Sequence, residues 1–277
     1  MKININDASF EVTEDQPFWE FLNGGNWEPG TFNVLESCLE PDNIFIDIGA
    51  WIGPVTLFAA AKGARVIALE PDPIAHQKLL QNIELNPSLK DRIKVLPVAI
   101  SARVGSSTLY ARSQYGASSS SLLKRTRDKL SDQIVETITL EKLLHDLEVK
   151  PDQISLIKID IEGAEFRSLP ELGTTCKNMR VPTVLVSLHY GHLIEHFFQT
   201  AIGIRVISLA CMKLEHLLGF SFFNKRLIAT AREALKSMDH YPNRYTLEGR
   251  HIEIKELKAS PWKFSDIVFT YRSGLTL

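Results

Sequence analysis

One short segment of the chain combines an acidic residue with two glycines at a spacing that suits a ligand-binding turn. The segment Asp47-Ile-Gly49-Ala50-Trp-Ile-Gly53 stands where an apolar run passes into a helical pattern. Glycines at such a turn let a ligand approach the backbone, and the following helix offers free N–H groups. The spacing differs from the Gly-x-Gly-x-x-Gly fingerprint that cradles a pyrophosphate. The carboxylate of Asp47 would repel a pyrophosphate, and it suits a ligand that carries an ammonium group.

A second acidic residue, Glu70, ends the next apolar run, within Leu69-Glu-Pro-Asp72-Pro. It follows the glycine turn by about 20 residues, the separation at which a strand-end carboxylate accepts both hydroxyls of a ribose. Such a carboxylate excludes a 2′-phosphate and therefore NADP. A ribose contact, an ammonium contact and no pyrophosphate cradle together indicate S-adenosylmethionine. The alternative is that Asp47 and Glu70 only cap helices.

Acidic and imidazole side chains at two later strand ends could perform a methyl transfer. Asp160 is our candidate for both catalysis and cofactor binding, and Glu162 for cofactor binding. If the strand continued through Glu162, both carboxylates would point to one side. Glu165 we interpret as an acid in the first turn of a helix. His189 follows the next strand, and with an ordinary pKa of ~6.5 it is our candidate base, with His192 as its competitor.

No metal ion is expected at this edge. Magnesium prefers oxygen ligands, and some enzymes that methylate hydroxyls use it to acidify an alcohol. The strand before His189 ends in Ser187-Leu-His-Tyr, without the further Asp or Asn that such a site would need.

The composition is that of a soluble globular protein. Hydrophobic residues make up 44% of the 277 residues and charged residues 23%, which excludes a disordered, collagen-like or coiled-coil chain. The net charge of −2 argues against a nucleic-acid partner. The dispersed cysteines Cys38, Cys176 and Cys211 predict neither disulfides nor a zinc site. Without a signal-type apolar block or an uninterrupted apolar span, we expect a cytoplasmic protein.

From residue 43 onward, apolar runs alternate with helical patterns. This alternation predicts a doubly wound α/β domain, with helices on both faces of a mostly parallel sheet. Between 102 and 129 it stops, and we interpret this part as a surface loop that ends in a solvated basic turn at 124–129. The expected strands are 44–48, 65–69, 93–98, 156–160 and 183–188, and the expected helices are 56–61, 76–86, 140–147 and 165–172.

We place one domain at 43–277, preceded by an N-terminal extension or lid at 1–42. A helical insertion at about 193–240 interrupts the domain before two final strands, at 245–254 and 266–272, which should pair antiparallel. Within the insertion, the apolar tract from 194 to 223 covers the sheet in our interpretation. The alternatives are a substrate lid, a surface for a homo-oligomer, or peripheral contact with a membrane if the acceptor is lipid-linked.

Three of these motifs resemble the FkbM family of S-adenosylmethionine-dependent methyltransferases. They are Phe45-Ile-Asp-Ile-Gly-Ala-Trp-Ile-Gly-Pro54, Leu69-Glu-Pro-Asp-Pro73 and Ile157-Lys-Ile-Asp-Ile-Glu-Gly-Ala-Glu165. The similarity runs from about Trp19 to Tyr190. It implies a class I methyltransferase fold, in which a seven-stranded sheet has its last strand antiparallel, and O-methylation of a sugar, glycan or natural product. By this resemblance, Asp47, Gly49 and Gly53 line the methionine of the cofactor, Glu70 binds the ribose, and Val98 and Ala99 line the adenine. Ala50 and Asp72 are further candidates for cofactor binding.

Residues outside these motifs are candidates for the remaining contacts. Thr31 could bond to the carboxylate of the cofactor, and Trp19, Trp27 and Glu28 could form a lid or a sugar-stacking surface. Core packing explains the tryptophans equally well. Further candidates for acceptor contacts are Tyr115 and His192. The alternative functions are N-methylation of a small molecule, an NAD-dependent oxidoreductase, and a non-catalytic module that binds the cofactor.

Overall fold

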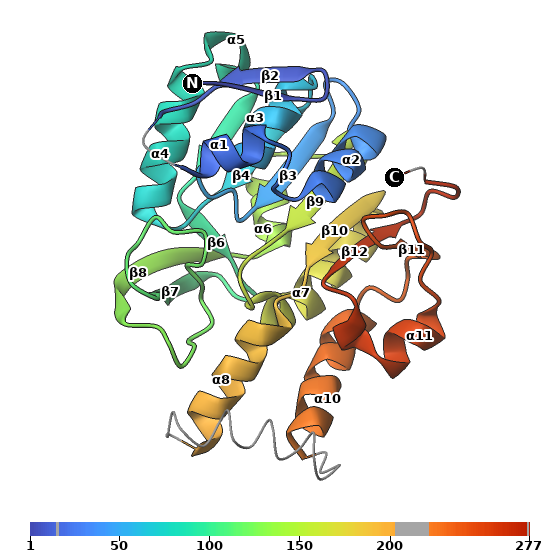
Figure 1. The fold of residues 1–277 in the computed structure, drawn as a ribbon. Helices are drawn as coiled ribbons and strands as arrows, with labels where there is room; N and C mark the ends of the chain where they lie inside the picture. Colours follow the sequence, from blue (N-terminus) through green and yellow to red (C-terminus); the bar gives the residue numbers. More distant parts are fainter. Residues whose placement is uncertain (15–16, 203–221, 276) are drawn as a thin grey trace.

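The computed structural model describes residues 1–14, 17–202, 222–275 and 277. Its central sheet has seven strands in the order β11-β12-β10-β9-β3-β4-β5 (Figure 1). The five strands from β10 to β5 run parallel, whereas β12 runs antiparallel to both of its neighbours. The expected α/β class is confirmed, and the sheet is mixed because β12 is reversed. The strands are β3 (Ile44–Ile48), β4 (Arg65–Leu69), β5 (Ile93–Leu96), β9 (Ile154–Ile159), β10 (Thr183–Ser187), β11 (Asn243–Tyr245) and β12 (Asp266–Thr270).

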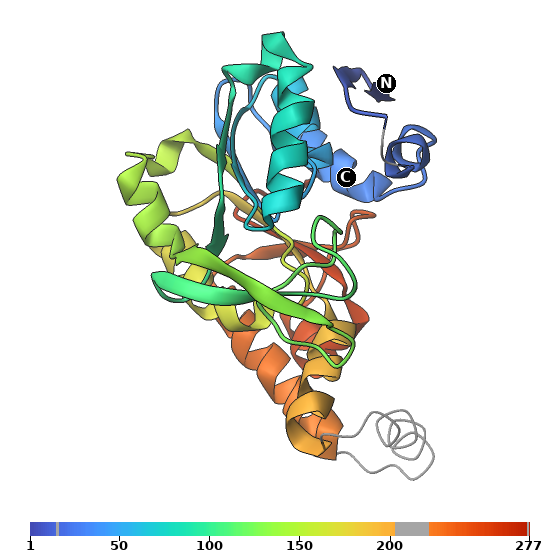
Figure 2. The ribbon, with the colours of Figure 1, turned by 90° about the vertical axis from the view of Figure 1, so that its left-hand side faces the viewer.

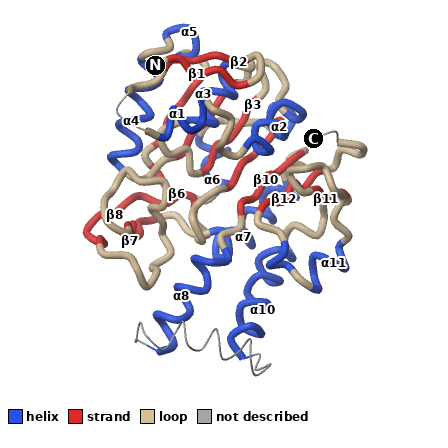
Figure 3. Tube along the Cα trace, in the orientation of Figure 1, coloured by secondary structure: helices blue, strands red, loops and turns tan. Residues whose placement is uncertain are grey.

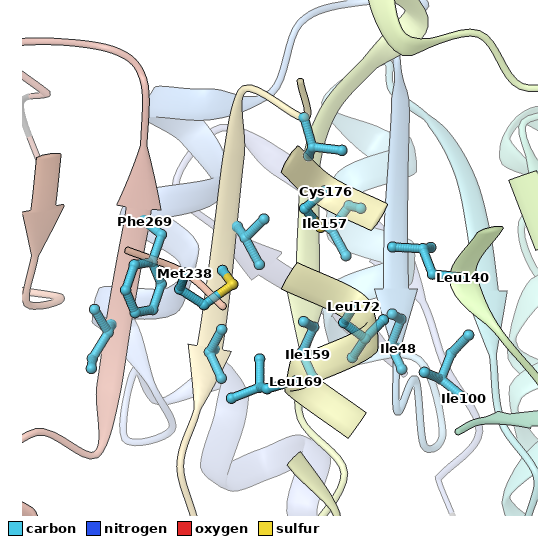
Figure 4. Packing of buried hydrophobic residues seen from close by; sticks show 14 of the residues in the cluster. Ile48, Ile100, Leu140, Ile157, Ile159, Leu169, Leu172, Cys176, Met238 and Phe269 are labelled. Atoms are coloured by element: carbon cyan, nitrogen blue, oxygen red, sulfur yellow. The ribbon is translucent and has the colours of Figure 1, made fainter. Parts of the chain in front are cut away.

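Both faces of this sheet are covered, because its central strands are apolar on both sides. In β3, Ile46 and Ile48 face one core while Phe45 faces the other. Figure 4 shows the first core, where Leu169 and Leu172 pack over the sheet. The helices on this side are α6 (Leu140–Asp146), α7 (Glu165–Asn178) and α10 (Phe222–Lys236), and those on the other are α3 (Pro54–Ala61) and α4 (Pro73–Glu84), the latter followed by the short α5 (Pro87–Lys90).

The N-terminal segment joins the second core. A hairpin of β1 (Lys2–Ile5) and β2 (Ala8–Glu11) precedes α1 (Phe18–Asn23) and α2 (Pro29–Cys38). Ile3, Phe10 and Trp19 are buried in the same cluster as Phe58 of α3. The extension is therefore packed onto the sheet domain, and it forms one wall of the site described below.

The region from 102 to 129 is not the simple surface loop that we expected. A second sheet of three strands contains β6 (Val98–Ile100), β7 (Gly105–Ala111) and β8 (Leu130–Ile138), as the side view in Figure 2 shows. The expectation of a solvated basic turn is wrong at Arg125, whose side chain is fully buried. Its guanidinium lies 2.9 Å from the carboxylate of the equally buried Asp128, and this pairing makes burial of the charge tolerable.

The expected strand at 245–254 is mostly wrong. β11 ends at Tyr245, and a turn follows in which Thr246 N donates to Arg250 O and Gly249 takes a positive φ of 78°. Residues after this turn form α11 (Ile254–Ala259). Short 3₁₀ helices occupy Pro151–Gln153 and Pro261–Lys263.

The described part of the expected insertion is helical. α8 (Tyr190–Ile202) leaves the sheet edge and projects beside α10, as the tube in Figure 3 shows. Our interpretation of the tract from 194 to 223 falls mainly on 203–221, which lie outside the described residues, as does Cys211. Among the helices of the described part, none is long and apolar enough to cross a membrane.

Candidate active site

Two neighbouring cavities lie at the carboxyl ends of β3, β4 and β9. The first cavity is lined by Ile48, Leu69, Glu70, Val98, Ala99, Ile100, Leu109, Ser120, Ser121 and Ile161, among others. The second cavity, of about 170 Å³, is lined by Phe18, Trp27, Glu28, Asp47, Ala50, Pro54, Val55, Lys158 and His189, among others. Both cavities share Gly49, Trp51, Ser118, Asp160 and Glu162 as walls. Ligands of open α/β sheets bind at this edge, so the cavities mark the candidate site.

Two glycines allow the turn between β3 and α3 to pass between its neighbours. Gly49 has a φ of +88°, and a Cβ atom there would lie 1.9 Å from the carbonyl oxygen of Asp160. Gly53 has a φ of +96°, and its Cβ would lie 2.4 Å from Leu79. Both positions therefore require glycine on two grounds, backbone conformation and space. Gly53 lies behind the cavity walls, whereas Gly49 and Ala50 line the second cavity.

Glu70 faces the first cavity and organises the turn above it. Its two carboxylate oxygens accept hydrogen bonds from Trp51 N at 2.7 Å and Asp72 N at 2.8 Å. Burial raises the pKa of Glu70 to about 8, although the two backbone donors oppose the shift. When the carboxyl is ionised, each oxygen retains a lone pair for a further donor in the cavity.

Asp72 has a positioning role in the structure. One carboxylate oxygen accepts from Ile74 N and Ala75 N and caps α4. The other accepts from Gly116 N at 2.7 Å and Ser120 Oγ at 2.6 Å. Asp72 thereby ties the loop that carries Ser118 and Ser120 to the first cavity, and it does not line either cavity itself.

Asp47 and Lys158 face each other on adjacent strands at the floor of the second cavity. Asp47 is fully buried, and its Oδ2 accepts from Thr56 Oγ1 at 2.6 Å. Its Oδ1 has no hydrogen-bond partner among the described residues. Burial raises the pKa of Asp47, with the Lys158 ammonium opposing that shift. Lys158 itself donates to Asp160 Oδ2 at 2.8 Å.

The carboxylates that follow β9 meet His189, but not as a continued strand would arrange them. β9 ends at Ile159, and Glu162 takes a left-handed conformation with a φ of 58°. This turn brings Asp160 Oδ1 and Glu162 Oε1 to 3.6 and 3.7 Å from His189 Nε2. Glu165 is fully buried at the start of α7, and its Oε1 lies 3.0 Å from His189 Nδ1. Glu165 is a helix-start acid as expected, and it also orients the imidazole.

The surrounding carboxylates control the charge of His189. Burial acts to lower the pKa of His189, but the Glu165 hydrogen bond and the charges of Glu165, Glu162 and Asp160 outweigh it and raise the pKa to about 10. Without a bound ligand, the imidazole of His189 is therefore a cation at neutral pH. Burial acts to raise the pKa of Asp160, yet Lys158 and His189 hold it below its ordinary value.

The wall opposite these strand ends comes from the N-terminal segment. The Phe18 ring contacts Trp51 with centroids 4.6 Å apart and Trp27 with centroids 5.1 Å apart. Glu28 has a left-handed backbone, with a φ of 40°, and its Oε2 accepts from Thr31 Oγ1 at 3.1 Å. Burial raises the pKa of Glu28 to about 7. Thr31 lies behind Glu28 and does not line the cavity.

The remaining candidates lie farther from the cavities. Tyr115 donates to Asp132 at 2.8 Å and lines neither cavity. His192 is not a wall residue either, but its Nδ1 lies 3.1 Å from Glu162 Oε2. Trp19 is fully buried in the core. Residues that the sequence reasoning missed are Lys158, Trp51, Ser118, Ser120 and the orienting role of Glu165, although Lys158 and Glu165 stand within the quoted motif around Asp160.

Comparison with known proteins identifies several methyltransferases that are similar to this chain. Over 157 residues, it is 30% identical to methyltransferase sdnD of Sordaria araneosa. That alignment covers 47% of this chain and 60% of sdnD, so the chain spans less than two thirds of the length of that relative.

Similar solved structures include the methyltransferase FkbM of Methylobacillus flagellatus KT. It is 18% identical, with 70% of this chain and 50% of that chain covered and a TM-score of 0.35. The human methyltransferase 10 domain containing protein is 13% identical, with 88% of this chain and 81% of that chain covered and a TM-score of 0.39.

The family match covers the strand ends that form the site. The methyltransferase FkbM domain matches residues 47–218, more than half of the chain. This range starts at Asp47 and includes Glu70, Asp160 and His189. The chain therefore belongs to the FkbM methyltransferase family.

Proposed function

We propose that this chain is an S-adenosylmethionine-dependent methyltransferase that methylates a hydroxyl of a sugar, glycan or natural product. One observation carries the proposal. A cavity with the carboxylate of Glu70 shares its walls with a second cavity that has the carboxylate of Asp47 at its floor. A single elongated ligand with a ribose at one end and an ammonium group at the other matches this arrangement.

The first cavity suits the nucleoside end of the cofactor. Val98, Ala99 and Leu109 supply apolar surface for a base. The carboxylate of Glu70 can accept from the ribose hydroxyls while it keeps its bonds to the backbone, because each oxygen accepts more than one donor.

The second cavity suits the methionine end. Asp47 Oδ1 is buried without a donor among the described residues, and a buried polar atom in a native protein ordinarily has a partner. An ammonium group would supply a donor of matching charge. The cavity walls carry four carboxyl groups, Glu28, Asp47, Asp160 and Glu162, against the basic groups of Lys158 and His189. This acidic surplus favours a ligand with two positive charges.

The residues at the edge of β9 and β10 suit the transfer itself. When bound, the cofactor supplies a methyl group on a positively charged sulfur that is a good leaving group. We propose that Asp160 and His189 contact the acceptor hydroxyl and hold its oxygen ~3 Å from the methyl carbon, in line with the bond that breaks. The role of His189 as base requires a neutral imidazole. Positive charge on a neighbouring ligand favours that form, and Glu165 keeps the remaining proton on Nδ1.

The aromatic wall supports an acceptor with a flat apolar face. Phe18, Trp27 and Trp51 line the second cavity opposite the strand ends. Aromatic rings offer a large apolar surface, and a sugar ring presents C–H groups on one face and hydroxyls at its rim. A neutral hydroxylated acceptor therefore matches this wall better than a charged one.

Calorimetry tests the cofactor part of the proposal. The protein is titrated with S-adenosylhomocysteine, the expected product, and with NAD as the control ligand. Micromolar binding of S-adenosylhomocysteine alone supports the proposal, and an acceptor screen with sugars and glycans follows. Binding of NAD alone, or of neither ligand, contradicts it. An Asp47→Asn variant should lose affinity, because Asn supplies no charge for the ammonium group.

A further inference from the structure

We propose that Asp160, Glu162 and His189 form a binding site for one divalent transition-metal ion, with Zn²⁺ as the best-fitting ion. The proposal rests on the proposed function only for its role in catalysis, since the ion-binding site itself is defined by these three side chains. One ligand atom from each can be chosen so that all three lie within 4.8 Å of one another. Asp160 Oδ1 and Glu162 Oε1 are the carboxylate oxygens that approach His189 Nε2. Carboxylate oxygens and imidazole nitrogens are both ligands that Zn²⁺ takes in proteins.

The separations of these atoms fit tetrahedral coordination. His189 Nε2 lies 3.6 Å from Asp160 Oδ1 and 3.7 Å from Glu162 Oε1. Two ligand atoms at ~2.1 Å from a tetrahedral Zn²⁺ lie ~3.4 Å apart. A contraction of a few tenths of an ångström would therefore bring each carboxylate oxygen to this separation from Nε2. Three protein ligands leave a fourth position open, as in catalytic zinc sites.

Each of the three side chains is oriented by a residue outside the group. Lys158 Nζ lies 2.8 Å from Asp160 Oδ2 and holds this oxygen, so that Oδ1 points toward His189. Arg125 Nη1 lies 4.0 Å from Glu162 Oε2, and this positive charge attracts Oε2, so that Oε1 is left toward the same point. Outer contacts of this kind orient the ligands of metal sites and raise their affinity.

The third ligand, His189, has the strongest orienting contact. Glu165 is fully buried and fixed by the backbone, because it accepts from Ile161 N at 2.9 Å and Gly163 N at 2.8 Å. Its Oε1 lies 3.0 Å from His189 Nδ1, so Nδ1 donates its proton to Glu165. An ion would displace the proton of the imidazolium from Nε2 and bind the lone pair that this proton leaves. A carboxylate behind a ligating histidine is the usual arrangement around protein-bound zinc.

An independent observation indicates that this cavity binds positive charge. Asp47 Oδ1, fully buried in the wall of the same cavity, has no hydrogen-bond partner among the described residues. The proposed ammonium contact would use Asp47, and Asp160 with Glu162 would remain for the ion. The expectation of no metal rested on the absence of a further Asp or Asn after β10. The left-handed turn at Glu162 supplies that second carboxylate from the end of β9 instead.

An ion at this position would lie beside the acceptor. All three proposed ligands line the cavity in which we place the hydroxyl, and an alcohol bound to a divalent cation is more acidic than a free one. His189 would then act as a ligand and no longer as the base. The ion would lower the pKa of the hydroxyl, and the hydroxyl proton would pass to water as the oxygen attacks the methyl carbon.

The test uses metal binding to the full chain. Protein freed of metal with a chelator is titrated by calorimetry with ZnCl₂, MnCl₂ and MgCl₂, with and without saturating S-adenosylhomocysteine. We expect one Zn²⁺ per chain, bound more tightly than Mg²⁺. Glu162→Gln and Glu165→Gln should each weaken Zn²⁺ binding by about 10- to 100-fold. The matched control is Glu253→Gln, because Glu253 lies 3.6 Å from His251 in an exposed pair and should leave the affinity unchanged.

The outcomes separate this inference from the proposed function. If S-adenosylhomocysteine binds but no metal does, the ion site is refuted and the methyltransferase proposal stands. If Zn²⁺ binds equally well to Glu162→Gln, Glu165→Gln and the control, the ion binds elsewhere and the inference is also refuted. If Zn²⁺ binding depends on both residues but the cofactor product does not bind, the ion site stands and the proposed function fails. Thermal unfolding of each variant checks that it is folded. If Glu162→Gln does not fold, the test uses Glu165→Gln instead.

Discussion

Replacing Glu70 with Gln tests how the first cavity is built, because one carboxylate holds both the turn and the proposed ribose. In the folded chain, its two oxygens accept from Trp51 N and Asp72 N. The Gln side chain has nearly the same shape but only one acceptor oxygen. One of the two backbone N–H groups must therefore face an NH₂ group.

The expected loss of stability follows from that single lost bond. A buried donor left without its acceptor costs about 1–3 kcal/mol. At this chain length, each kcal/mol lowers the melting temperature by about 2–4 °C. The matched control is Glu84→Gln, an exposed residue paired with Lys90, for which a change within about 0.5 kcal/mol is expected.

The pH of the measurement matters because burial raises the pKa of Glu70 to about 8. The folded carboxyl binds its proton more tightly than the unfolded one, whose pKa is 4.5. Its contribution to stability therefore falls as the pH rises from about 4.5 to about 8, and is constant above. This fall should be missing in Glu70→Gln, which makes the stability difference between the two proteins pH-dependent over that range.

The expected loss of cofactor affinity is separate from the loss of stability. Hydrogen bonds to a charged group contribute about 1.5–3 kcal/mol, which corresponds to about 10- to 150-fold in the dissociation constant. Calorimetric titration with S-adenosylhomocysteine, at a pH above the pKa of Glu70, measures this loss of affinity. A folded Glu70→Gln variant with unchanged affinity would refute the ribose contact, and an unchanged melting temperature would refute the account of the turn.

Three further changes test other parts of the structure. Gly49→Ala places a methyl group 1.9 Å from Asp160 O at a residue with a positive φ. The free energy of unfolding measured with urea should therefore fall by more than about 3 kcal/mol. An unfolding midpoint close to that of the native chain would contradict the packing. Arg125→Met leaves the buried carboxylate of Asp128 unpaired and should lower the free energy of unfolding by about 3–5 kcal/mol in the same assay. The double variant that adds Asp128→Asn should recover part of this loss. Equal stability of the single variant and the native chain would be inconsistent with the buried pair. The pKa of Glu28 is raised to about 7, so this carboxyl loses its proton as the pH rises from 6 to 8. The affinity for the positively charged S-adenosylmethionine should therefore increase over that range in the native chain, and it should increase less in Glu28→Gln. Identical pH profiles of the two proteins would show that Glu28 does not lie near the cofactor.

The strands of the central sheet could be predicted because their signal is local. The run Ile44-Phe-Ile-Asp-Ile is apolar on both sides, and only a strand covered on both faces accommodates it. Gly49 and Gly53 likewise indicate a turn by their type alone. These local signals are sufficient to place Asp47 and Glu70 at the correct edge of the sheet.

The remaining features depend on contacts between distant parts of the chain. Arg125 lies in a run of charged residues that is typical of a solvated turn. Its burial is explained by contacts with Asp128, the carbonyl of Ser119 and His192. β8 has an exposed face with polar residues, which hides its strand character. The expected strand after Tyr245 failed because a turn around Gly249 reverses the chain.

The site shows the same division between local and distant contacts. The positions of Asp160, Glu162 and His189 at neighbouring strand ends could be predicted from the alternation of strands and helices. Their convergence depends on the left-handed backbone of Glu162, a conformation that a glutamate rarely adopts and that no sequence pattern indicates. The proposed ion site depends on that turn, and the raised pKa of His189 depends chiefly on the buried Glu165. Neither could therefore be predicted from the sequence.

The close approach of Gly49 to Asp160 has a consequence for how such enzymes diversify. At this point two backbones meet with no side chain between them, so substitutions cannot adjust the spacing without breaking the contact. The opposite wall consists of side chains such as Phe18 and Trp27, which come from a separate stretch of chain. Exchange of these side chains leaves the contact between the two backbones in place. We therefore expect new acceptors to be acquired by replacement of the N-terminal wall, while the geometry of methyl transfer is inherited unchanged.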